Sequence, residues 1–387
     1  MRKYLLIVTL LLPLLYSCSK GGDDDGGNPP PPPPPPPPTT QVDIVEIDNA
    51  VKDFMTTNVI PGVSIAVVKA GKLVYVKSYG KMSASDNTPV TNTSLYRIAS
   101  VSKPITAVGI MKLLEANKLT LDSKVFGASS ILGADYPTAP AATHNITVGQ
   151  LLQHTVNAWG NDGNDPMFKQ PTYNHSQLIK WTLENYPATN PRGYYKYSNF
   201  GYCLLGRIIE KLSGKSYEQF IKEEVLTPAG ISNMKMGGNT LADRKTGEVL
   251  YTGQGGSDPY AYKIDRMDAH GGWIASATDL ARFMIAVDGF NTKPDILKSS
   301  TITTMVTRLV PSSNYACGWG VNDANHWWHT GSLPGTATEI IRSAGGFSWV
   351  ILCNSRGTKA SFDGALDNLL WPFVNSNTTP WQNIDQF

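Results

Sequence analysis

The chain has 387 residues, of which 41% are hydrophobic and 17% charged, enough apolar sequence for one large or two modest domains. Its formal net charge is +2, and taking Arg2 and Lys3 of the basic N-terminal start from the 33 basic residues leaves 31, equal to the 31 acidic residues. This balance excludes a basic nucleic-acid-binding surface and a polybasic membrane patch as the basis of function. We therefore expect no nucleic-acid partner.

Residues 1–17 have the pattern of a secretory signal peptide, with an apolar run, Leu5–Leu15, that is too short to span a bilayer. Residues 15–18, Leu-Tyr-Ser-Cys, resemble a bacterial lipobox, which predicts cleavage before Cys18 and lipidation of that cysteine. The alternative is an ordinary signal peptide that ends near a cysteine. We expect a bacterial outer-membrane lipoprotein, periplasmic or cell-surface, that is anchored in the membrane by the lipid on Cys18.

Residues 18–40 are predicted to be a tether, with an acidic run at Asp23–Asp25 and an unbroken proline run at Pro29–Pro38. A polyproline II helix of that length is a stiff spacer of roughly 30 Å. The remaining residues, 41–387, are predicted to form the folded domain. Neither its cysteines nor its histidines show a metal-ligand spacing, so we expect no metal and no cofactor.

The start of the domain predicts a helix and a hairpin. Val42–Thr57 has helical periodicity, and Val63–Lys69 and Leu73–Gly80 are β-rich runs joined at Ala70-Gly71, a two-residue turn.

The middle of the chain predicts helices and loops up to about Leu309. Apolar residues at helical spacing and capping signals indicate helices after Ser100, from Thr147 to His154, over Phe200–Leu212, after a capping box of Ser216 and Gln219, and over Leu280–Val287 after Ser276 and Asp279.

Strand patterns return at the C-terminal end, over Trp327–Gly331, Thr336–Arg342 and Phe347–Asn354, followed by a closing helix over Ser361–Phe373. Strands at both ends with helices between them predict an α+β fold. In this fold one antiparallel sheet is built from both chain ends and flanked by helices, and a mostly helical region is inserted.

Ser100 and Lys103 lie at the start of a helix whose apolar stripe includes Val101 and Ile105. The free N–H groups there favour negative charge on an attacked acyl oxygen, and a buried, neutral lysine one turn away can take the serine proton. Ser-x-x-Lys also occurs at Ser17 and Ser232, so the motif alone is equally consistent with a helix N-cap.

Tyr197-Ser198-Asn199 immediately precedes a predicted helix. The Tyr197 hydroxyl is a candidate general base or proton relay toward Ser100, and the Asn199 amide is a candidate binder of a substrate carbonyl. The alternative is an asparagine N-cap after a chance tyrosine.

His329-Thr330-Gly331 opens the C-terminal strands. His329 can donate a proton, Thr330 can bind a carboxylate, Gly331 allows close approach of a substrate, and the Ser332 N–H can complete an oxyanion hole with that of Ser100. A literal Lys-Thr-Gly triplet at Lys245 lies in a polar stretch without a following hairpin, so we predict that it forms a turn.

Together these motifs, in this order, resemble those of the serine β-lactamase and penicillin-binding protein superfamily. The Tyr-x-Asn form is similar to class C β-lactamases, soluble D,D-peptidases and related esterases. Flanking sequence supports the resemblance over roughly Val42–Phe373: Pro61–Val68, Tyr96–Ala99, Leu151–Thr155 and Gly271–Ser276. The resemblance implies that Ser100 forms an acyl-enzyme and that Lys103 and Tyr197 share the proton transfers. Which of the two is the base stays open.

Two departures bear on the substrate. His329 stands where class C β-lactamases carry lysine, and Val156–Trp159 replaces the usual Ser-Gly after the Leu-Leu-x-His-Thr segment, whose His154 we expect to be structural. A neutral histidine weakens binding of a β-lactam carboxylate. We expect an exported monomeric serine hydrolase for a small-molecule or peptide substrate, cleaving an amide, D-amino-acid peptide or ester. The alternatives are a dedicated β-lactamase and a catalytically inert surface binding lipoprotein.

Overall fold

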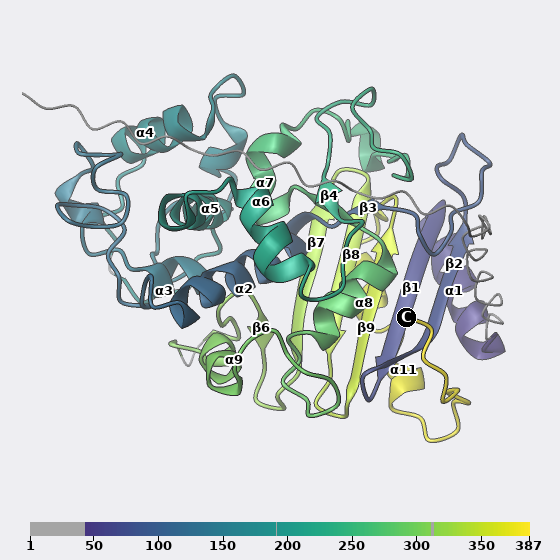
Figure 1. Ribbon diagram of the computed structural model, residues 1–387. Helices are drawn as coiled ribbons and strands as arrows, with labels where there is room; N and C mark the ends of the chain where they lie inside the picture. The colour runs from purple at the N-terminus through teal and green to yellow at the C-terminus, as the bar shows by residue number, and fades with distance from the viewer. Residues whose placement is uncertain (1–42, 191, 311–312) are drawn as a thin grey trace, which may run out of the picture. The chain divides into compact units, whose positions relative to one another are not determined.

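A computed structural model describes residues 43–190, 192–310 and 313–387 (Figure 1). The predicted signal peptide, Cys18 and the tether lie outside the described residues. Within the described ranges, no helix has the length and apolar character needed to cross a membrane.

The main sheet has six antiparallel strands in the order β2-β1-β9-β8-β7-β6. Its strands are β1 (Gly62–Lys69), β2 (Lys72–Gly80), β6 (Gly320–Val321), β7 (Trp327–Leu333), β8 (Thr336–Arg342) and β9 (Phe347–Cys353). Because β1 pairs with β9, the sheet joins the two ends of the domain, which confirms the predicted fold class.

The β1–β2 hairpin turns at Ala70 and Gly71, which both have positive φ, 49° and 74°. Two consecutive residues with positive φ form the tight hairpin turn whose twist matches that of antiparallel strands. The predicted hairpin is confirmed.

Helices cover both faces of the sheet (Figure 1). On one face, α1 (Val45–Asn58) and α10 (Phe362–Asp367) pack against alternate residues of β1 and β9, such as Ile65 and Ile351. On the other face, α8 (Ala277–Ile285) packs against β9 and β1. The period-two alternation of the strands separates the two apolar layers.

The remaining helices lie beside the β7–β6 edge of the sheet or close the chain (Figure 1). They are α2 (Ser102–Glu115), α3 (Val148–Leu152), α4 (His175–Asn185), α5 (Asn199–Ser213), α6 (Tyr217–Ile221), α7 (Asp268–Gly271), α9 (Ser299–Val306) and α11 (Trp371–Val374). Residues 102–111 of α2 are buried on every side, so α2 is the central helix of this region.

The predicted closing helix is wrong as a single element, because it divides into α10 and α11. Pro372 lies in the first turn of α11, where it has no N–H to continue a helix from α10. The predicted capping box of Ser216 and Gln219 is only half formed. The Ser216 side chain accepts from Gln219 N–H, but among the described contacts the Gln219 side chain does not accept from Ser216 N–H.

A second, three-stranded sheet was not predicted. Its strands β3 (Tyr96–Arg97), β5 (Trp273–Ala275) and β4 (Lys235–Met236) lie in the order β3-β5-β4 and have only two or three residues each. Strands this short show no alternation in the sequence, so only tertiary pairing defines them.

Strand β7 lies against the chain just before Ser100. A Cβ placed on Gly331 would lie 2.2 Å from Ile98 O and 2.3 Å from Thr338 Oγ1. Glycine at this position therefore permits the contact that brings the third motif to the first.

We expect Gly331→Ala to lower the free energy of unfolding by about 1–3 kcal/mol, because the added methyl group overpacks this contact. Urea unfolding of the purified variants measures the change. Gly345→Ala is the matched control, because its Cβ would meet only Ser343 Oγ at 3.7 Å. Equal stability of the two variants would contradict the prediction.

Candidate active site

Ser100 lies in a one-turn 3-10 helix, Ala99–Val101, and α2 begins two residues after it. The prediction that Ser100 stands at the start of this helix therefore holds to within one turn. Thr338 Oγ1 donates to Ile98 O at 2.8 Å, and Ala99 has a positive φ of 47°. Sheet contacts and a strained residue thus fix the backbone that carries the Ser100 hydroxyl.

The side chain of Lys103 is fully buried and lies beside Ser100. Its Nζ is 3.0 Å from Ser100 Oγ, 2.7 Å from Asn199 Oδ1 and 2.9 Å from the carbonyl oxygen of His270. Burial holds the pKa of Lys103 well below its usual value, although the charge of Asp165 acts in the opposite direction. The neutral form of this amine can accept the serine proton.

Tyr197 also lies beside Ser100 and Lys103. Lys103 Nζ is 4.7 Å from the centroid of the Tyr197 ring. Burial raises the pKa of Tyr197, while a side-chain hydrogen bond with Ser100 works against that rise. Tyr197 is therefore held as a neutral phenol within reach of the Ser100 hydroxyl.

Asn199 joins Lys103 to a buried carboxylate. Its Oδ1 accepts from Lys103, and its Nδ2 donates to Asp165 Oδ2 at 2.6 Å and to Asn161 Oδ1 at 3.2 Å. Burial raises the pKa of Asp165. These bonds fix the orientation of the Asn199 amide, with its oxygen toward the lysine.

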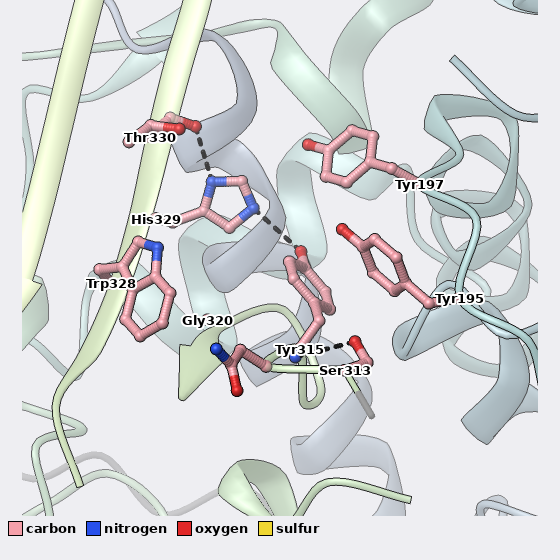
Figure 2. A pocket seen from close by; sticks show the side chains of 9 residues that line it. Tyr195, Tyr197, Ser313, Tyr315, Gly320, Trp328, His329 and Thr330 are labelled. Atoms are coloured by element: carbon pink, nitrogen blue, oxygen red, sulfur yellow. Dashed lines mark hydrogen bonds between the residues drawn. The ribbon is translucent and has the colours of Figure 1, made fainter. Parts of the chain in front are cut away.

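His329 is buried and neutral. Its Nδ1 lies 2.7 Å from the carbonyl oxygen of Thr330, so Nδ1 carries the proton, and its Nε2 accepts from the Tyr315 hydroxyl at 2.9 Å (Figure 2). Burial, together with the charge of Lys103, lowers the pKa of His329 to about 3. The third motif therefore brings no positive charge to the site.

Two cavities border these residues. The smaller one, about 90 Å³, contains Ser100, Asn199 and Ser332 among its lining residues. The larger one, about 480 Å³, has Tyr195 and Tyr197 on one side and Trp328, His329 and Thr330 of β7 on the other (Figure 2). Every residue that we predicted for catalysis or substrate binding is thus brought to one region of the molecule.

His154, which we expected to be structural, lies behind Tyr197. It is buried, its Nδ1 accepts from the Ser198 N–H at 3.1 Å, and its ring packs at a tilt against the Tyr197 ring, with 4.2 Å between the ring centroids. Burial and the charge of Lys103 lower its pKa well below the usual value. These contacts place Tyr197 and leave His154 without access to substrate.

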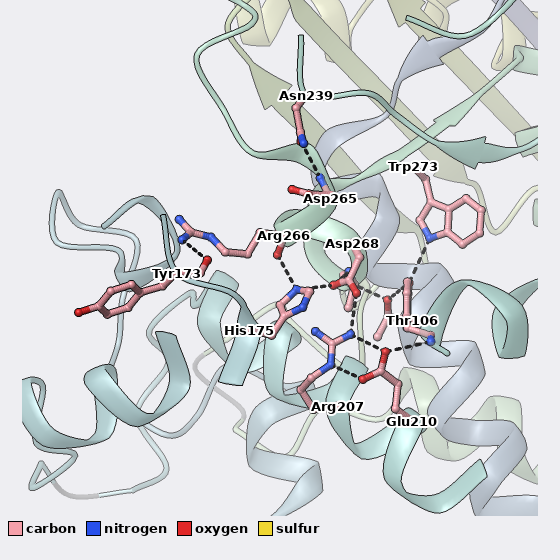
Figure 3. A network of polar contacts seen from close by, with 12 residues as sticks. Thr106, Tyr173, His175, Arg207, Glu210, Asn239, Asp265, Arg266, Asp268 and Trp273 are labelled. Carbon is pink, nitrogen blue, oxygen red and sulfur yellow. Dashed lines mark hydrogen bonds and ion pairs between the residues drawn. The ribbon is translucent and has the colours of Figure 1, made fainter. Parts of the chain in front are cut away.

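A buried network of ion pairs holds α7, which carries the His270 carbonyl group that accepts a hydrogen bond from Lys103. Asp268 of α7 lies 2.6 Å from Arg207 Nη2 and 3.5 Å from His175 Nε2 (Figure 3). Burial acts to raise the pKa of Asp268, but Arg207 holds it well below the usual range. Thr106 of α2 donates to Ala269 O at 2.6 Å, so α7 is fixed against the helix that carries Lys103.

Two other segments with motif-like sequences, the Lys-Thr-Gly triplet at Lys245 and the Ser-x-x-Lys at Ser232, are not part of this site. Lys245–Gly247 forms the predicted turn, in which Glu248 N–H donates to Lys245 O at 3.0 Å and Gly247 has a φ of 82°. Ser232 is exposed in a loop.

Sequence reasoning missed Asp165, Asn161, His270 and Tyr315. Asp165 is the N-cap of a one-turn helix that begins at Pro166, and its side chain accepts from Met167 N–H at 2.9 Å. The sequence Asp-Pro is typical of such a helix start and was the one local signal that marked Asp165. The other three act through a backbone oxygen or through a single side-chain contact, which no spacing in the sequence marks.

We expect acylation of Ser100 to depend on the protonation of Lys103 and not on a histidine. Only the neutral amine accepts the serine proton, so the rate of labelling by a fluorophosphonate falls about tenfold per pH unit below the pKa of Lys103. His329, with a pKa of about 3, stays neutral above about pH 5, so His329→Gln keeps the same acid limb. Lys103→Met slows labelling by about 10²–10⁴-fold. An acid limb that disappears in His329→Gln would contradict this assignment.

Comparisons with known proteins identify the family and the fold. A family profile described as Beta-lactamase matches residues 47–370. Penicillin-binding protein 4* of Bacillus subtilis (strain 168) is 26% identical over 308 residues, which cover 72% of this chain and 64% of that protein. This chain therefore spans less than two thirds of that relative's length.

Two further proteins are similar over more of their length. Penicillin-binding protein 4 of Amycolatopsis lactamdurans is 26% identical over 79% of this chain and 81% of its own. The octameric penicillin-binding protein homologue from Pyrococcus abyssi superposes with a TM-score of 0.67 at 26% identity, covering 86% of this chain and 80% of that one. Since the family profile matches most of the sequence, the chain belongs to the β-lactamase family.

Proposed function

We propose that this protein is a serine hydrolase that forms an acyl-enzyme with an amide, a D-amino-acid peptide or an ester. The observation that carries the proposal is the fully buried amine of Lys103, 3.0 Å from the hydroxyl oxygen of Ser100. A helix N-cap serine needs no such amine. A lysine that served only as a structural cation would be expected to pair with a carboxylate, whereas this one contacts a hydroxyl and two carbonyl oxygens.

In the proposed reaction, Ser100 Oγ attacks the acyl carbon while its proton passes to Lys103 Nζ. The proton then reaches the leaving group, with the neutral phenol of Tyr197 as relay, and the acyl group stays on Ser100. A water molecule attacks the ester in the second half, and its proton returns by the same groups. Lys103 is assigned as the base because burial lowers its pKa, whereas burial holds Tyr197 protonated.

The charge of the cavities bears on the substrate class. None of the described residues that line the two cavities beside Ser100 is lysine or arginine, and His329 is neutral. A β-lactam carboxylate therefore meets no cation on these two sets of walls. A nearby cation is Arg356, which pairs with Asp363 and lines a cavity that shares Ser332 and Leu333 with the smaller one. An ester, an amide or a D-amino-acid peptide without a carboxylate next to the cleaved bond consequently fits these walls better than a β-lactam.

Labelling with two probes tests the proposal. We expect a fluorophosphonate to label the wild-type protein and Ser232→Ala, and to leave Ser100→Ala unlabelled. Ser232 is the matched control because it begins the other Ser-x-x-Lys in the described part of the chain. A fluorescent penicillin should give a slow, stable adduct at Ser100 or none.

The other outcomes point to the alternatives. Rapid turnover of a β-lactam would favour a dedicated β-lactamase. If neither probe attached to Ser100 in the folded protein, the hydrolase proposal would fail and a binding lipoprotein would take its place.

We also propose that the protein is exported and anchored in the bacterial outer membrane through a lipid on Cys18. The support is the basic start, the short apolar run and the lipobox-like sequence that ends at Cys18. In cells fed labelled palmitate, we expect the wild-type chain to incorporate label, Cys18→Ala to lose it, and Cys203→Ala to keep it. Equal labelling of Cys18→Ala and the wild type would contradict the anchor.

A further inference from the structure

A third cavity, of about 350 Å³, is bounded by β7, β8, α10 and α11, and we call it the acidic pocket. Its described lining residues are Asn322, His326, Trp328, Thr330, Glu339, Ile341, Asp363, Asp367 and Trp371. Three of these are carboxylic acids and none is lysine or arginine. The proposed hydrolytic mechanism uses none of the three acids.

Glu339 is the central residue of the acidic pocket. It lies on β8 between Ala337 and Ile341, at a place in the α10-facing layer where its neighbours are apolar. It is 1% exposed, and its Oε2 has no hydrogen-bond partner in the part of the chain that the structure describes. A buried carboxylate without a partner is costly, so a ligand that supplies a positive charge would be strongly favoured here.

The groups around Glu339 strengthen this preference. Burial, with the charges of Asp367 and Asp363 acting in the same direction, raises the pKa of Glu339 to about 8. Arg356 pairs with Asp363 at 2.8 Å, but it is not among the lining residues of the pocket. His326 accepts from Ala344 N–H through Nδ1, and Thr330 and Ile351, the cross-strand neighbours of Glu339, carry no charge.

The walls suit an organic cation better than a metal ion. Trp328 and Trp371 line the pocket, and indole rings attract ammonium groups through the faces of their π-systems. In the described ranges, no group of three or more His, Cys, Asp and Glu residues is placed to hold a metal ion. Asp363 is already engaged by Arg356, which leaves Glu339 and Asp367 for a ligand.

The acidic pocket shares lining residues with the larger cavity, the one lined by Tyr197 and His329. Trp328 and Thr330 of β7 line both cavities, and Figure 2 shows both residues on the strand at the edge of the larger one. Trp328 and Thr330 are therefore the side chains that a ligand reaching from the larger cavity to Glu339 has to pass.

We propose that the acidic pocket binds the primary ammonium group of a ligand that extends from the larger cavity, the one lined by Tyr197 and His329, with Glu339 and Asp367 as the counter-charges. That this ligand is a substrate or product of Ser100 rests on the proposed function. The binding of the ammonium group does not, because the pocket contains none of the proposed catalytic side chains.

Calorimetric titration of the full chain with butylammonium, and with 1-butanol as the neutral match, tests the proposal. Alkylammonium groups stay charged at pH 9, since they titrate near the ~10.4 of lysine. If only ionised Glu339 binds, a carboxyl with a pKa of about 8 predicts affinity that rises up to about a hundredfold from pH 6 to pH 9. We expect butylammonium to bind the wild type and Ser100→Ala alike, and 1-butanol not to bind.

Glu339→Gln should abolish this binding, and Asp367→Asn should weaken it. Glu184→Gln, which changes an exposed glutamate on α4, is the matched control and should bind as the wild type does. Glu339→Gln should also unfold at an equal or higher temperature at pH 9. The reason is that a carboxyl whose pKa is raised in the folded state destabilises the fold as the pH rises from its unfolded pKa through about 8.

Absence of saturable butylammonium binding at pH 9, or equal binding by folded Glu339→Gln, would overturn the proposal. Binding of Ca²⁺ without butylammonium would overturn it too, by replacing the organic cation with a metal. Binding that persists in Ser100→Ala, while no probe labels Ser100 in the wild type, would leave this site standing and refute only the proposed hydrolase.

Discussion

The burial of Lys103 is the constraint on which the site depends. A charged ammonium can donate three hydrogen bonds, whereas the neutral amine has two N–H groups and one lone pair. The oxygens of Asn199 and His270 accept from two N–H groups in either form. Toward Ser100 Oγ, 3.0 Å away, the ammonium donates its third N–H, whereas the neutral amine can turn its lone pair to the hydroxyl. The surroundings thus satisfy both protonation states of Lys103, and burial lowers its pKa in the direction that populates the neutral amine.

Each group that contacts Lys103 is itself held from a distant part of the chain. Asn199 is oriented by Asp165, and the carbonyl group of His270 belongs to α7, which Asp268 ties to Arg207 of α5. The third motif reaches the site because Gly331 lets β7 lie against Ile98. The sheet, which joins the two chain ends, and the helical region meet at this point. Loss of any one support moves a group that touches Ser100 or Lys103.

Local signals in the sequence predicted the parts that local physics determines. The β1–β2 hairpin follows from a two-residue turn, and α2 from an apolar pattern that begins beside Ser100. The parts that were missed depend on tertiary contact. The short strands β3, β4 and β5 have no periodicity of their own, and Tyr315 matters only because folding brings its hydroxyl to His329. Motif order located the site, but the hydrogen bonds that set its protonation states required the fold.

The charges along β7 connect the chemistry of the site with its choice of ligand. His329, on the side of Ser100, is kept neutral by burial and by the hydroxyl of Tyr315, so the third motif gives a carboxylate no cation to pair with. On β8, opposite Thr330, Glu339 adds an acid that the fold leaves unpaired. Both features disfavour an anionic ligand and favour a neutral or cationic one. Taken alone, histidine in place of lysine in the third motif removes the attraction between the site and a ligand carboxylate. Together with Glu339, once that acid is ionised above its pKa of about 8, it makes this edge of the sheet attract a cation.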